Sequence, residues 1–71
     1  MTDQELLEDF VSFLKKQLHF GSSKSPLLHA MIDQYTSYEN DKEKITAGLH
    51  RLNAVQFIDG VAKIDMDKIP Q

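Results

Sequence analysis

The residues best suited to metal binding are His29 and Asp33, which stand one helical turn apart. An imidazole and a carboxylate at i and i+4 can face one ion, and His19 or His50 could add a third ligand in space. The chain has no HExxH pattern and no other complete ligand set. Because such pairs often arise by chance on the polar face of a helix, we predict a surface side-chain pair, no metal and no other cofactor.

Catalysis by a serine would need a base and an orienting group in the same cleft. Ser22, Ser23 and Ser25 lie together in a polar segment, and no base partner for them can be identified. The carboxylates are scattered over expected solvent faces, and three glycines do not form a phosphate-binding loop. We therefore expect no enzymatic activity and no small-molecule substrate.

The composition is that of one small globular domain spanning residues 1–71, with 41% hydrophobic and 27% charged residues. The absence of cysteine excludes disulfides and thiolate sites and fits a reducing compartment. No apolar run is long enough for a signal peptide or a membrane span. We expect a soluble, cytoplasmic protein without a membrane partner, and the formal charge of −3 favours protein partners over nucleic acid.

Three amphipathic helices are predicted, over residues 3–19, 26–37 and 41–52. The first begins at a capping box formed by Thr2 and Glu5, and its apolar residues recur at spacings of three and four. Ser25 before Pro26 is typical of a helix start, and Asn40 with Glu43 repeats the capping pattern. The inward face of the third helix is expected to be Ile45, Gly48, Leu49 and Leu52.

A β-hairpin is predicted over residues 54–66, because Asp59-Gly60 favours a type I′ turn, in which both central residues need positive φ. The turn pairs Ile58 with Val61 and so fixes the register. One side of the hairpin is then apolar and is expected to pack on the helices, with Phe57 in the core; its residues are Val55, Phe57, Ala62, Ile64 and Met66. The tail 67–71 is expected to fray.

The predicted fold is α+β and mostly α: three helices followed by a C-terminal two-stranded hairpin. The stretch "ITAGLHRLNAVQFIDGVAKI" resembles the recognition helix and wing of winged helix-turn-helix domains, with apolar residues at matching places: Ile45, Leu49, Leu52 and Phe57-Ile58. The resemblance implies a DNA-binding regulator. Two departures stand against it: Gln56 occupies a place where the family often has Gly, and Asp59 at the hairpin tip would repel a phosphate.

Two functional hypotheses follow. The first is a non-enzymatic, regulatory binding module that contacts a protein partner or forms a homodimer. Its candidate interface consists of apolar residues left outside the expected core: Ile58, Val61, Phe13 and Phe20. The alternative is a winged-helix transcriptional regulator that contacts duplex DNA through the third helix and the hairpin. Its candidate contacts are Lys42, Lys44, Thr46, His50, Arg51 and Lys63.

Overall fold

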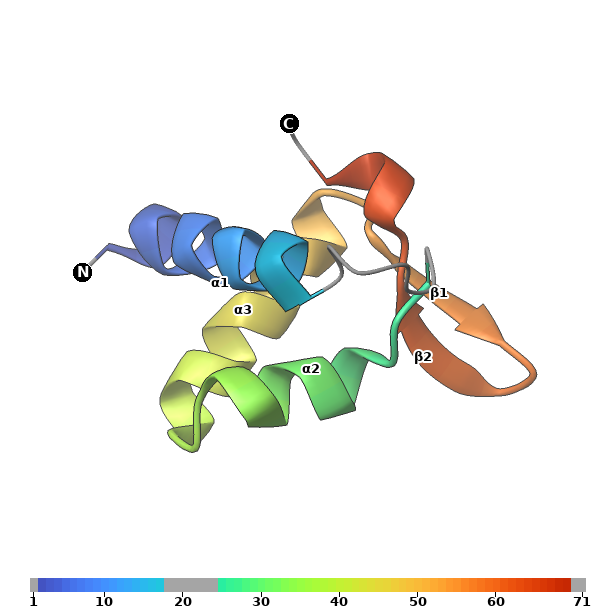
Figure 1. The fold of residues 1–71 in the computed structure, drawn as a ribbon, viewed down its shortest axis with the longest axis horizontal. Coiled ribbons are helices and arrows are strands. Elements are labelled where there is room, and N and C mark those ends of the chain that lie inside the picture. The colour runs from blue at the N-terminus through green and yellow to red at the C-terminus, as the bar shows by residue number, and fades with distance from the viewer. Residues whose placement is uncertain (1, 18–24, 70–71) are drawn as a thin grey trace.

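The computed structural model describes residues 2–17 and 25–69, in which three helices precede a two-stranded antiparallel sheet (Figure 1). The predicted α+β, mostly α fold is therefore confirmed. No helix in these two ranges is long and apolar enough to cross a membrane. The elements are α1 (Asp3–Gln17), α2 (Leu28–Tyr35), α3 (Glu39–Arg51), β1 (Val55–Ile58), β2 (Val61–Ile64) and the 3₁₀ turn η1 (Met66–Lys68).

The capping box at the start of α1 is confirmed. The Thr2 N–H donates to Glu5 Oε1 and the Glu5 N–H donates to Thr2 Oγ1, both at 3.1 Å. The bond from the Thr2 backbone holds the pKa of Glu5 below its usual range, because it stabilises the carboxylate. The predicted end of this helix at residue 19 lies outside the described residues, as does Phe20.

The segment before α2 is extended, so the prediction of a helix from residue 26 is wrong. Ile64 donates its N–H to the Pro26 carbonyl at 2.8 Å, and Leu27 forms a β-bridge with Lys63. Pairing with β2 therefore holds residues 26 and 27 outside the helix, and α2 begins at Leu28 without a side-chain cap. It also ends two residues earlier than predicted, because Thr36 is extended at φ −148°.

Helix α3 begins at Glu39, two residues before the predicted start, so Asn40 lies inside the helix and is not its N-cap. Its end depends on Asn53, which has a φ of 57°. The Asn53 N–H donates to the His50 carbonyl at 3.0 Å and the Ala54 N–H donates to the Leu49 carbonyl at 2.9 Å. This is a Schellman motif, and it lets the chain leave the helix without a glycine at position 56.

The hairpin has the predicted register, with Ile58 opposite Val61 and Val55 opposite Ile64. Asp59 and Gly60 have φ values of 54° and 78°, the positive values that a type I′ turn requires. The sheet contains these two strands in the order β1-β2.

The core lies where α1 packs against α3 and where α2 packs against β2. The inward face predicted for α3 is confirmed: Ile45, Gly48 and Leu49 are buried and Leu52 is half-buried. The largest fully buried side chains come from every helix and from β2: Phe10, Leu14, Leu28, Ile45, Leu49 and Ile64.

The predicted burial of Phe57 is wrong, since 72% of this residue is exposed. Val55 and Ile64, at the base of the hairpin, pack against the core. The turn end projects beyond the helices, at the right of Figure 1. Phe57 shares the face of Val55 and lies on β1, whereas Ala62, its partner on β2, packs against the core.

The segment after β2 is ordered further than expected. The Asp65 carboxylate accepts the Asp67 N–H at 3.1 Å and so caps η1. Ile69 then enters the core with 4% of its surface exposed. The predicted fraying from residue 67 is therefore wrong as far as Ile69, and residues 70 and 71 lie outside the described ranges.

Candidate protein-interaction site

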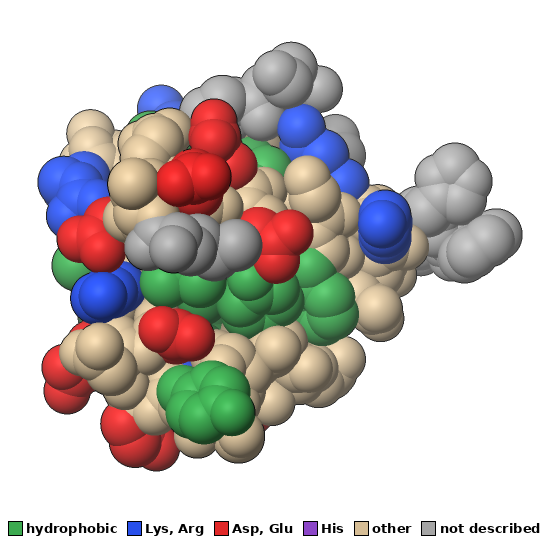
Figure 2. All heavy atoms as spheres, turned by 90° about the vertical axis from the view of Figure 1, so that its left-hand side faces the viewer, with side chains coloured by type: hydrophobic (Ala, Val, Ile, Leu, Met, Phe, Trp, Pro, Cys, Tyr) green, Lys and Arg blue, Asp and Glu red, His purple; other side chains and the backbone are tan. Residues whose placement is uncertain are grey.

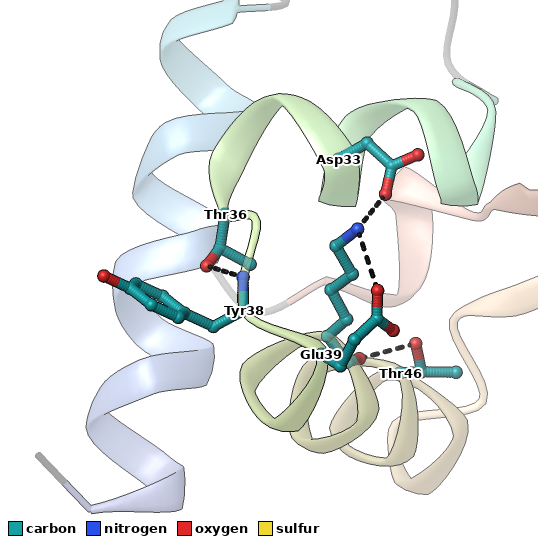
Figure 3. A network of polar contacts seen from close by, with 6 residues as sticks. Asp33, Thr36, Tyr38, Glu39 and Thr46 are labelled. Carbon is teal, nitrogen blue, oxygen red and sulfur yellow. Dashed lines mark hydrogen bonds and ion pairs between the residues drawn. The ribbon is translucent and has the colours of Figure 1, made fainter.

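The exposed large apolar side chains gather at the hairpin. Within residues 2–17 and 25–69 there are five such residues, and four of them belong to the hairpin or to the segment paired with it. They are Leu27 at 48% exposure, Phe57 at 72%, Ile58 at 37% and Val61 at 44%. The fifth, Tyr38, follows α2 at 71% exposure, and its ring points away from the neighbouring polar network (Figure 3).

Three of these side chains share one face of the sheet. Directly paired residues of an antiparallel ladder point to the same side, and this side alternates along each strand. Ile58 pairs with Val61, and Leu27 pairs with Lys63, two residues further along β2 than Val61. We call Leu27, Ile58 and Val61 the hairpin face; it points away from the side of Val55 and Ile64 that packs on the core.

Polar contacts fix the base of the hairpin face. Gln56 Nε2 donates to Ser25 Oγ at 3.0 Å, which ties β1 to the segment that carries Leu27. Lys63 is half-buried beside them. The exposure of Ile58 and Val61 agrees with their choice as candidate interface residues. Leu27 was missed because a local reading placed it in a helix, and no local signal predicts its pairing with β2.

Phe13 does not belong to this site. Its ring stacks on Phe10 with centroids 6.2 Å apart and lies 5.4 Å from the ring of Tyr35. The Tyr35 hydroxyl donates a hydrogen bond to the Asp9 carboxylate. Burial, and then this hydrogen bond, raise the pKa of Tyr35 to about 12. Phe13 is thus half-buried in an aromatic cluster between α1 and α2.

The candidate DNA contacts at the start of α3 are engaged within the protein. Lys42 Nζ lies 2.8 Å from Asp33 Oδ1 and 3.6 Å from Glu39 Oε1 (Figure 3). The hydrogen bond with Asp33 raises the pKa of Lys42 by stabilising the ammonium. Thr46 Oγ1 donates to the Lys42 carbonyl at 2.8 Å. Lys42 therefore links α3 to α2 through Asp33, whereas the Thr46 hydroxyl bonds within α3.

The remaining candidate DNA contacts lie on α3 and on β2. Lys44 Nζ lies 3.5 Å from Asp3 Oδ1, while His50 and Arg51 are exposed near the end of α3 and Lys63 lies on the hairpin. On the molecular face opposite the hairpin, acidic and basic side chains are interspersed around a strip of apolar ones (Figure 2). Lys42 and Lys44 are thus each paired with an acidic side chain of another helix.

An open groove of about 610 Å³ separates α2 from α3. His29, Asp33 and His50, which the sequence offered as possible metal ligands, all line this groove. Asp33 is paired with Lys42, however. Among the described residues no three His, Asp or Glu side chains are grouped to hold a metal ion. His19 lies outside these residues. The groove also carries the carboxylates of Glu39 and Glu43, so its surroundings disfavour the approach of phosphate.

Comparison with protein-family models, curated proteins and solved structures found no match to this chain.

Proposed function

We propose that this protein is a small, non-enzymatic, regulatory binding module that acts through protein–protein contacts, with the hairpin face as its contact surface. One observation carries the proposal: Leu27, Ile58 and Val61 all lie exposed on one face of the sheet. Single exposed apolar residues are common on monomers, whereas a group on one surface is typical of an interaction site.

The hairpin face is suited to binding because its backbone is already ordered. Two strands and the bridge at Leu27 fix the positions of the side chains, so little conformational entropy is lost on association. Burial of each aliphatic side chain would contribute roughly 1 kcal/mol, since about half of each is exposed. Gln56 and Lys63 supply polar groups on the same face. A partner with an apolar centre and an acidic rim would complement it.

Retention of partners on immobilised protein tests the proposal. Wild type, an Ile58→Ser/Val61→Ser variant and a Tyr38→Ser control are exposed to extract of the source cells, after circular dichroism has established folding. We expect polypeptides that wild type and Tyr38→Ser retain and the hairpin variant loses. An identical set of polypeptides on all three proteins would refute the hairpin face as the contact surface.

A DNA-binding regulator of winged-helix type is the second candidate. It is favoured by the exposure of His50 and Arg51 on α3 and by the absence of an ion pair for either among the described residues. Titration with mixed-sequence duplex DNA at low and then moderate salt tests it. Amide shifts centred on α3 that fade steeply with salt would support it. An unchanged spectrum at low salt would reject it.

A further inference from the structure

The two edges of the hairpin differ. The outer edge of β2 is covered, because the Pro26 carbonyl accepts from Ile64 and Leu27 bridges to Lys63. No strand within residues 2–17 and 25–69 pairs with the outer edge of β1. Natural sheet edges are commonly protected by charged residues, proline or bulges. The sequence of β1, VQFI, contains no charge and no proline.

The free hydrogen-bonding groups on the edge of β1 can be identified. Pairs in an antiparallel ladder alternate between those that exchange hydrogen bonds and those whose backbone groups point outward. The Ile64 N–H points outward, toward Pro26. Val55, the partner of Ile64, therefore directs its N–H and C=O to the other side, and Phe57 does the same. No described residue forms a hydrogen bond with these groups.

We propose that β1 pairs antiparallel with β1 of a second copy of this chain, forming a continuous four-stranded sheet across a two-fold axis. Gln56 lies on the axis. Val55 of each copy then exchanges hydrogen bonds with the partner's Phe57. The interface is isologous, so one edge supplies both surfaces.

The positions of the outward groups select this register. When Val55 lies opposite the partner's Phe57, every outward N–H and C=O of both strands forms a hydrogen bond. A register shifted by two residues would place Phe57 opposite itself and Val55 opposite the partner's Asp59. Asp59 has a φ of 54° and belongs to the turn, so it cannot pair as an extended residue.

The side chains also fit this pairing. Val55 and Phe57 point to the same face, and Val55 packs against the core of its own copy. In the dimer the exposed ring of Phe57 lies beside the partner's Val55, which removes apolar surface from water and forms an aromatic–aliphatic cross-strand pair. The residues at the axis are the uncharged Gln56 side chains, so no like charges meet there.

The short strand limits the strength of the dimer. An interface built on strands of four residues falls below the roughly 1,200 Å² at which standard stable interfaces begin. We therefore expect dissociation constants between about 1 µM and about 1 mM. The dimer is thus a reversible one, governed by local concentration.

The pairing deepens the proposed function without depending on the same residues. The two-fold axis runs perpendicular to the sheet, so the hairpin faces of both copies lie on the same side. The dimer therefore presents the hairpin face twice to one partner. Loss of pairing would leave each hairpin face intact, and loss of the hairpin face would leave the edge of β1 intact.

Sedimentation equilibrium from about 10 µM to about 1 mM protein tests the dimer. Phe57→Lys places a charge on the edge, whereas Tyr38→Lys changes an equally exposed aromatic residue at the start of α3. We expect the wild type and Tyr38→Lys to dimerise and Phe57→Lys to dissociate at least about tenfold more readily. A monomeric wild type at the highest concentration would overturn the proposal.

Cysteine cross-linking tests the register, because the chain has no native cysteine. Gln56→Cys places two thiols across the axis, where Cα atoms of about 4.5 Å separation suit a disulfide. In the same dimer, the cysteines of two Ile58→Cys copies lie about four residues apart along the strands, roughly 13 Å. We expect rapid oxidation to a covalent dimer for Gln56→Cys alone. Faster cross-linking of Ile58→Cys would show face-to-face association and overturn edge pairing.

Discussion

Gly48 lies where α3 packs against Leu7 of α1. A Cβ at this position would lie 3.0 Å from Leu7 Cδ2 and 3.1 Å from Leu7 Cδ1. Gly48→Val should lower the free energy of unfolding by about 1–3 kcal/mol, because the added atoms overpack the helix contact. Urea denaturation measures the change. Ala47→Val is the matched control on the exposed side of α3, and equal losses in the two variants would contradict the contact.

Tyr35 should titrate well above an ordinary tyrosine. Burial and the hydrogen bond to Asp9 raise its pKa to about 12, whereas an unfolded tyrosine titrates near 10. The chain has two tyrosines, so Tyr38→Phe leaves Tyr35 as the single chromophore for tyrosinate absorbance. We expect a midpoint near 12 in the folded protein and a lower one when Asp9→Asn is added. A midpoint near 10 in folded Tyr38→Phe would contradict the aromatic cluster.

The raised pKa of Tyr35 sets a pH window for stability. The folded state holds the phenol proton more tightly than the unfolded state, so this contribution is complete below pH 10. It is lost as the pH rises from 10 toward the folded value of about 12. Thermal melting across this range should show a decline that Tyr35→Phe lacks. An equal loss of thermal stability in both proteins would show that groups other than Tyr35 cause it.

At the scale of elements, the sequence predicted correctly those features that depend on residues close together in the chain. The capping box of Thr2, the three-four spacing of α1 and the Asp59-Gly60 turn each act within a few residues, and all three are present. The departures come from contacts across the chain. Pairing with β2 removes Pro26 from α2, a feature that no short window of the sequence contains.

In the candidate site, too, some residues were predictable from local signals and others depend on contacts across the chain. The hairpin register, which the turn fixes locally, placed Ile58 and Val61 on the otherwise polar side of the hairpin but left their exposure open. Leu27 joined them only through its bridge to β2. Phe57 is exposed although Ala62, its partner on β2, packs against the core, and the alternation of side chains does not reveal which of the two strands the helices cover.

The segment after β2 belongs to the core, and Ile69 tests this. Ile69 is 4% exposed, so Ile69→Val should lower the free energy of unfolding by about 1 kcal/mol and Ile69→Ala by about 2–5 kcal/mol. Lys68→Ala, at an exposed neighbour, should stay within about 0.5 kcal/mol of wild type. Chemical denaturation measures all three. An Ile69→Ala variant as stable as Lys68→Ala would show that the tail does not pack.

At the scale of the whole molecule, charge should oppose self-association. Each copy has a formal charge of −3, and β1 contributes no ion pair to the proposed dimer. Raising the salt concentration from about 10 mM to about 150 mM screens this repulsion. Sedimentation should therefore show tighter dimerisation at higher salt. Weaker dimerisation at higher salt would point to an ion-paired interface elsewhere.

The most direct measurement of the central claim is an amide NMR spectrum of the labelled chain in unlabelled extract of its source cells, compared with the spectrum in buffer. Protein contact through the hairpin predicts loss of signal at Leu27 and across residues 55–64, with the amides of α3 little changed. The Ile58→Ser/Val61→Ser variant should retain these signals. Signal loss centred on residues 42–51, with the hairpin unaffected, would contradict the account.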